Sequence, residues 1–195
     1  DQDPKLLSYR YFFIRKLMFI KESDATILFP GGYGTMDEAY EGLTLLQTGK
    51  SMPRPVILAC HSGSRYWEEW VSFFTELMLP LGYISKDDLD LFTICHTEED
   101  IKTAIQNFYK NYHSLRYVGS KTVLRLHEQL SDSALDALNE EFSDIIVDGR
   151  IEKSEPLKEE LDSKDQLRKA RLAFHFNKVN FGRLVTLIRR VNALS

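Results

Sequence analysis

The sequence predicts an α/β fold in which a parallel sheet is covered by helices on both faces, followed by a small α+β appendage. Through residues 5–113, continuous apolar runs of strand length alternate with amphipathic helical segments, which is the pattern of a parallel sheet buried on both sides. A glycine-rich loop joins the first apolar run to its helix. Beyond residue 113 the apolar residues alternate with polar ones instead. We therefore expect a Rossmann-like domain over residues 1–113 and the appendage over residues 114–195.

Composition limits the classes of protein to which the chain can belong. Its 195 residues are 43% hydrophobic, enough to bury a core for one domain with an appendage. A net charge of -4 gives no electrostatic footprint for nucleic acid or an anionic membrane, so we expect neither as a partner. Cys60 and Cys95 both stand in apolar runs, which favours buried, reduced thiols and a cytoplasmic location.

The first elements lead to the glycine loop. Residues 5–21 are rich in apolar and aromatic side chains and predict a helix that is buried on most sides. Residues 25–29 form a short apolar run that predicts a strand, and the helix after the loop is expected over residues 36–47.

The strand and helix unit repeats twice more. The predicted strands are 54–60 and 89–95, and the predicted helices are 64–82, broken near Pro80, and 97–112, capped by Thr97. Because only three such strands occur and the chain opens on a helix, we expect the N-terminal part of the domain to be absent from this chain.

The appendage is predicted from three segments. Residues 121–129 alternate like a half-exposed strand, and residues 131–146 form a capped amphipathic helix. Residues 152–169 are dense in charge and predict a connector. Residues 170–194 then give an alternating strand, with Phe174 and Phe176 facing the core and His175 between them, and a last helix.

The loop in "TILFPGGYGTMDEAYEGL" is built to hold an anion. Glycines allow successive N–H groups to point at one ligand, and the helix that follows adds unpaired amides and a positive dipole end. A dinucleotide fingerprint would need glycine at Asp37, so an NAD site is disfavoured. The "TGKS" of residues 48–51 lacks the leading glycine of a P-loop because Thr44 stands there. A phosphate group fits the loop best.

Glu38 allows two interpretations. With Thr35 it completes an S/T-x-x-E capping box, in which its carboxylate would only cap its own helix. Alternatively, it lies about one turn, ~5 Å, beyond the phosphate-binding amides, where a ribose attached to that phosphate would lie. There it could stabilise an oxocarbenium-like C1′ or position water. Glu41 shares this helix face, although a solvated or hydrogen-bonded surface acid is the more usual explanation of such a position.

Two further residues are candidates for the same cleft. Arg15 is expected to lean toward the glycine loop, where a buried guanidinium would require an anion. That anion could be the ligand or a protein carboxylate such as Glu38 or Glu41. His61 follows a predicted strand and could border the cleft, or it could be an ordinary structural or exposed histidine.

The segment from Phe12 to Lys50 resembles the LOG ("lonely guy") family. The hallmark of that family is an Arg-Lys pair on a helix followed by P-G-G-x-G-T-x-x-E. Here the pair is Arg15-Lys16, and the second motif is complete at every fixed position from Pro30 to Glu38. The resemblance extends with decreasing sharpness to about Tyr112.

The resemblance implies a nucleoside 5′-monophosphate phosphoribohydrolase that releases free base and ribose 5-phosphate. Arg15 and Glu38 would be the catalytic pair, and Lys16 a further candidate. The 5′-phosphate would be held by Gly31, Gly32, Tyr33, Gly34 and Thr35. The implied substrates are monophosphates such as AMP or a cytokinin riboside monophosphate, the implied assembly is a homodimer or a higher homo-oligomer, and no metal or redox cofactor is implied.

Of two other interpretations, decarboxylation is rejected and a binding function stays open. Members of the family are often labelled lysine decarboxylases, but that chemistry uses pyridoxal phosphate on a Schiff-base lysine, and no lysine is singled out here. A non-catalytic nucleotide-binding or sensing protein would also be compatible with the fold and the phosphate loop. The appendage would then modify either function as an oligomerisation or regulatory element.

Overall fold

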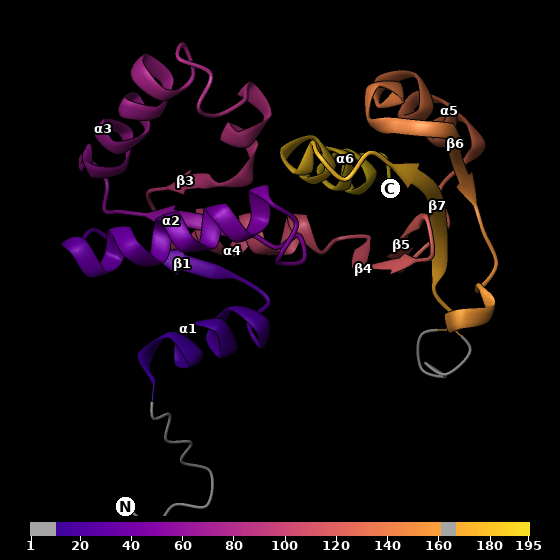
Figure 1. Ribbon diagram of the computed structural model, residues 1–195, viewed down its shortest axis with the longest axis horizontal. Coiled ribbons are helices and arrows are strands. Elements are labelled where there is room, and N and C mark those ends of the chain that lie inside the picture. Colours follow the sequence, from indigo (N-terminus) through magenta and orange to yellow (C-terminus); the bar gives the residue numbers. More distant parts are fainter. Residues whose placement is uncertain (1–10, 161–166) are drawn as a thin grey trace, which may run out of the picture.

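The computed structural model describes residues 11–160 and 167–195. It contains a three-stranded parallel sheet, in the order β1-β2-β3, and a four-stranded antiparallel sheet, in the order β4-β5-β7-β6 (Figure 1). The helices are α1 (Phe12–Lys21), α2 (Tyr33–Gln47), α3 (Tyr66–Phe73), α4 (Glu98–Phe108), α5 (Asp132–Glu141) and α6 (Phe181–Ala193). The strands are β1 (Thr26–Leu28), β2 (Val56–Ala59), β3 (Thr93–Cys95), β4 (Tyr112–Val118), β5 (Lys121–Leu126), β6 (Ile146–Lys153) and β7 (Ala170–Phe176). The predicted mixture of a parallel α/β sheet and a further α+β part is confirmed.

Helices cover both faces of the parallel sheet, as predicted. The central strand β2 is buried along its whole length. On one face Ile57, Ala59 and Cys95 pack against side chains of α4. On the other face Leu58 belongs to the main core, together with residues of α2, α3 and α6. Because neighbouring parallel strands end at the same edge, the loops after β1, β2 and β3 all lie at the carboxyl edge of this sheet.

Two predictions about local structure are wrong, and two strands were not predicted. Only the second half of segment 89–95 is a strand, because Ser85 and Asp88 form a capping box that starts a 3₁₀ helix over Lys86–Leu91. Segment 121–129 is not half-exposed: β5 lies between β4 and β7 and is buried on both faces. The sequence also gave no signal for β4, or for β6, whose last two residues fall in the predicted connector.

Helix α1 is far less buried than its composition predicts. Phe13 and Phe19 are 60% and 62% exposed, whereas Lys16 is buried. Apolar side chains from which burial of this helix was predicted therefore lie on the surface of the described part of the chain. Residues 5–10 of the predicted helix lie outside the described residues.

A buried ion cluster joins the antiparallel sheet to the segment of the chain that precedes β7. Glu160 is fully buried. Its Oε1 accepts hydrogen bonds from Arg125 Nε at 2.9 Å and Nη2 at 2.6 Å, and its Oε2 accepts one from Arg171 Nε at 3.2 Å. Burial alone would raise the pKa of Glu160, but the hydrogen bonds from Arg125 and from the Leu157 amide, with the charge of Arg171, lower it below its ordinary value of 4.5.

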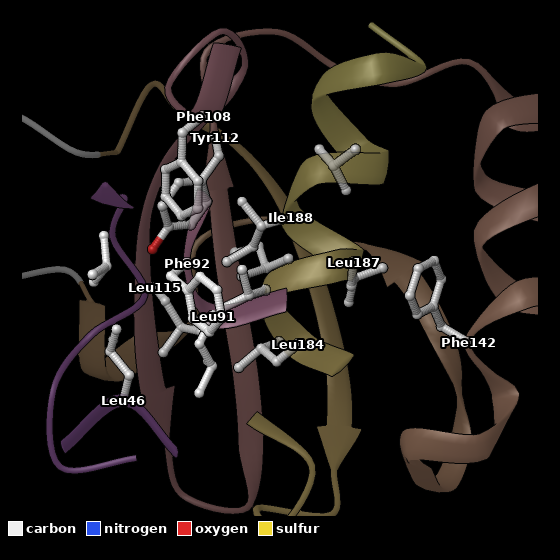
Figure 2. Packing of buried hydrophobic residues seen from close by; sticks show 14 of the residues in the cluster. Leu46, Leu91, Phe92, Phe108, Tyr112, Leu115, Phe142, Leu184, Leu187 and Ile188 are labelled. Carbon is white, nitrogen blue, oxygen red and sulfur yellow. The ribbon is translucent and has the colours of Figure 1, made fainter. Parts of the chain in front are cut away.

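Helix α6 lies between the two sheets and joins them into one core (Figure 1). Figure 2 shows Leu184, Leu187 and Ile188 of this helix among the buried side chains of the main cluster. The helix also approaches the 3₁₀ helix closely, since a Cβ on Gly182 would lie 2.1 Å from the carbonyl oxygen of Asp87. Near its end, Asn192 accepts hydrogen bonds from the amides of Asn111 and Tyr112, both at 2.8 Å.

Cys60 and Cys95 are both free and buried, as predicted. Across residues 11–160 and 167–195, no helix has the length and apolar character needed to cross a membrane.

Candidate functional site

The glycine loop leads directly into the N-terminus of α2. The helix begins at Tyr33, so Gly32 is its N-cap, with an extended backbone at φ -93° and ψ -151°. Glycine has no side chain that could accept a hydrogen bond from the amides of the first turn, and that turn carries no acidic residue. The positive end of the helix dipole is therefore not neutralised by its own cap, which suits it to an external anion.

Thr35 does not cap the helix, and this settles the first interpretation of Glu38. Thr35 lies inside α2, three positions beyond the observed cap, so Thr35 and Glu38 cannot form a capping box. The threonine packs instead against the loop: a Cβ on Gly31 would lie 2.2 Å from Thr35 Oγ1. Glycine at position 31 is thus required by close packing of the loop on its own helix.

Replacing Gly31 with alanine is expected to destabilise the protein by about 1–3 kcal/mol, the usual cost of forcing a group into a packed site. Gly34→Ala is the matched control, because a Cβ at Gly34 meets nothing within 4 Å and alanine favours a helix. Urea unfolding of the two variants measures the difference. Equal stabilities would show that the loop relaxes without cost.

Tyr66 ties the glycine loop to the next helix. Its hydroxyl group donates a hydrogen bond to the carbonyl oxygen of Gly31 and lies 3.3 Å from the Gly31 amide, which donates to it. The sequence analysis missed this residue. The available signal was its position, because Tyr66 begins α3 directly after the loop that follows β2, at the same edge of the sheet.

Lys16 contacts three carboxylates that lie on one face of α2. Its Nζ contacts Asp37, lies 3.3 Å from Glu38 Oε1 and lies 3.0 Å from Glu41 Oε2. The hydrogen bond to Asp37 is the largest influence and raises the pKa of Lys16, burial opposes it, and Glu41 and Glu38 add to the rise. Lys16 is therefore a fixed positive charge that holds Glu38 and Glu41 against α1.

Arg15 occupies a different environment from the one predicted. Its side chain is exposed, and its guanidinium lies 6.0 Å from the centre of the Phe19 ring, one turn further along α1. The expectation of a buried guanidinium is wrong. The carboxylates named as its alternative partners, Glu38 and Glu41, both contact Lys16.

The remaining candidates differ in access to solvent. The Glu38 side chain is 40% exposed despite its ion pair, and Tyr33 is almost fully exposed. A substrate at the N-terminus of α2 could therefore reach the Glu38 carboxylate.

His61 is exposed, and its Nδ1 donates a hydrogen bond to the carbonyl oxygen of the neighbouring Ser62 at 2.9 Å. This contact stays within its own loop.

Comparison with known proteins supports a family assignment. A protein-family model described as "Possible lysine decarboxylase" matches residues 2–105, slightly more than half of the 195 residues. The matched range includes the glycine loop, Lys16 and all three carboxylates of the cluster. A search of curated proteins gave no match. The chain therefore belongs to the family described as possible lysine decarboxylases, which is the family of the LOG-type proteins.

Proposed function

We propose that the protein is a nucleoside 5′-monophosphate phosphoribohydrolase. The reaction consumes one water molecule and yields the free base and ribose 5-phosphate. The observation that carries the proposal is the pairing of a helix N-terminus without a side-chain cap and a carboxylate held in the second turn of the same helix. Together they offer one group for the phosphate of a nucleotide and another for its ribose.

The phosphate is proposed to bind at the start of α2. Gly31 and Gly32 let the backbone approach the ligand closely, and the first amides of the helix point toward it. The absence of an acid from the first turn supports this assignment, because a carboxylate there would compete with the phosphate for the same amides. Gly34 leaves open space beside the helix start.

Glu38 is proposed to act on the glycosidic bond. It lies five residues, ~8 Å of rise, beyond Tyr33 at the helix start, a displacement that a 5′-phosphate and its attached sugar ring can span. As the bond from C1′ to the base breaks, its electrons leave with the base and C1′ gains positive charge. The carboxylate would stabilise this charge and accept a proton from the attacking water.

Lys16 is proposed to position Glu38 rather than to touch the substrate. It is buried, positively charged and already bonded to three carboxylates. The contact at 3.3 Å from Lys16 Nζ to Glu38 Oε1 would hold the carboxylate in place beside α1. Arg15 stands next to Lys16 on α1 with an exposed side chain, and we propose that it contacts the substrate.

The contacts of Lys16 also argue against amino-acid decarboxylation. A Schiff-base lysine must become neutral to attack a carbonyl carbon, which requires a lowered pKa. Lys16 is the buried lysine among the described residues, and its three carboxylate partners move its pKa in the opposite direction. We therefore favour hydrolysis of a nucleotide over the activity in the family description.

The direct test is a product assay with the purified protein. The protein would be incubated with AMP, GMP, CMP, UMP and a cytokinin riboside monophosphate. Free base and ribose 5-phosphate would then be quantified by chromatography. We expect both products in equal amounts from at least one nucleotide, and none from the corresponding nucleosides, which lack the phosphate. Binding of a nucleotide without product would support a sensing protein instead and would contradict the proposal.

A further inference from the structure

A second cluster of reactive side chains lies at the carboxyl edge of the parallel sheet. Cys60 follows β2, His96 follows β3, and Glu68 belongs to the first turn of α3. The Cys60 sulfur lies 3.4 Å from His96 Nδ1, and His96 Nε2 lies 3.0 Å from Glu68 Oε1. One ligand atom from each residue lies within 4.8 Å of the other two.

We propose that Cys60, Glu68 and His96 form a binding site for a divalent transition-metal ion, with Zn²⁺ as the ion that fits best. A thiolate, an imidazole and a carboxylate are the ligand types that proteins use for zinc. Calcium and magnesium prefer sites made of oxygen atoms, so a sulfur ligand disfavours both. Three protein ligands leave a fourth position of the tetrahedron for water or another small ligand.

The spacing of the first two ligands already matches such a site. Zinc bonds of about 2.3 Å to sulfur and about 2.0 Å to nitrogen place the two ligand atoms roughly 3.5 Å apart in a tetrahedron. The observed separation between the Cys60 sulfur and His96 Nδ1 is 3.4 Å. A cation bound between these atoms would thus need little movement of either side chain.

Glu68 supplies a carboxylate oxygen that lacks a partner. Its Oε2 atom is buried and has no hydrogen bond within the described part of the chain, although the side chain as a whole is 36% exposed. A buried polar atom without a partner is costly, and a cation beside it would remove that cost. The long side chain of Glu68 can turn toward the sulfur, since only its Oε1 is engaged.

The fold explains why these three residues meet. Ala59 and Cys95 are partners in the parallel register of β2 and β3, so the residues that follow them, Cys60 and His96, are neighbours. Alternation along the strands places Cys95 on the face that packs against α4, while Cys60 belongs to the core on the opposite face. Trp67 Nε1 donates a hydrogen bond to the Ala59 carbonyl oxygen at 3.0 Å, which holds Glu68 beside them.

The experiment uses the purified full chain after removal of metal with a chelator. Titration with Zn²⁺ by calorimetry is expected to give one bound ion per chain. Titration with Co²⁺, a spectroscopic substitute for zinc, is expected to give the near-ultraviolet charge-transfer band of a cobalt–thiolate bond. Cys60→Ser should lose this band, and Cys95→Ser is the matched control that should keep it, because Cys95 is a buried free thiol on the other face of the sheet.

Two further variants keep the test informative if Cys60→Ser does not fold. Glu68→Gln and His96→Gln alter side chains that are partly exposed, and each should weaken zinc binding at least tenfold while circular dichroism shows an unchanged fold. The proposal is overturned if the unmutated chain takes up no Zn²⁺, or if the cobalt spectrum lacks the thiolate band. It is also overturned if an alkylating reagent modifies Cys60 quickly and at the same rate with and without zinc, since that result would identify a hydrogen-bonded nucleophilic thiol.

Discussion

Replacing Glu38 with glutamine is expected to abolish hydrolysis of nucleoside monophosphates while leaving their binding intact. Glutamine has nearly the same shape but can neither accept a proton from water nor offset positive charge at C1′. Removal of such a group typically costs 10²–10⁴-fold in rate. The helix start that is proposed to hold the phosphate is unchanged, so calorimetry should show a dissociation constant for the nucleotide within about threefold of that of the unmutated protein.

Two controls separate this effect from general damage around Lys16. Asp37→Asn removes another partner of the same lysine but not the proposed catalytic carboxylate, so its loss of rate should be below tenfold. Glu140→Gln changes an exposed acid on α5 and should have no effect. If Asp37→Asn is as inactive as Glu38→Gln, the acids matter only through their effect on Lys16, and the assigned role of Glu38 is wrong.

Replacing Glu160 with glutamine is expected to lower the free energy of unfolding by about 3–5 kcal/mol, the usual cost of removing one member of a buried ion cluster. Buried Arg125 and Arg171 would both lose the negative charge that Glu160 supplies. Unfolding in urea measures the loss. The matched control is Glu159→Gln, because that acidic side chain is adjacent in sequence but exposed; its stability should change by less than about 0.5 kcal/mol.

The effect of Glu160 should also depend on pH. The folded protein holds the pKa of Glu160 below its ordinary value of 4.5. Its contribution to stability is therefore fully present above that value and is lost as the pH falls through the lower pKa of the folded state. The difference in stability between the unmutated protein and Glu160→Gln should be constant from pH 6 to 7 and should shrink below pH 4.5. A difference that does not change with pH would mean that packing, not charge, makes Glu160 important.

Much of the parallel sheet could be predicted because its signals are local. Part of each of the three predicted strands of this sheet is a strand, and Thr97 caps α4 through a capping box with Asp100, as its sequence indicates. Strands β4 and β6 were missed because charged residues and Gly149 interrupt their patterns, and pairing with β5 and β7 supplies what the local sequence lacks. The division of the chain at residue 113 and the proposed homodimer stay predictions.

The candidate site was predictable only where its residues are close in sequence. The glycine loop and Glu38 lie within one short segment, so their chemistry could be inferred from spacing, although the cap was assigned to Thr35 rather than Gly32. The ion pair between Lys16 and Glu38 depends on how α1 packs against α2. Tyr66 was not predicted either, because its contact with Gly31 joins the glycine loop to the start of α3, which is distant in sequence.

The same was true of the cluster of Cys60, Glu68 and His96. Strand register and the placement of α3 bring these residues together. No spacing along the chain indicates that these three residues lie together. Sites assembled by pairing between distant strands become visible only when the fold is known.

The position of α6 has a consequence for how the protein is made. Its side chains complete the core above the parallel sheet, beside Phe92 and Tyr112, yet the helix follows every strand in the chain. On the ribosome, the first sheet would emerge with these apolar residues uncovered, because contacts distant in sequence form late. We therefore expect the newly made first sheet to depend on chaperones until residue 193 has left the exit tunnel, after which both sheets become ordered in one cooperative step.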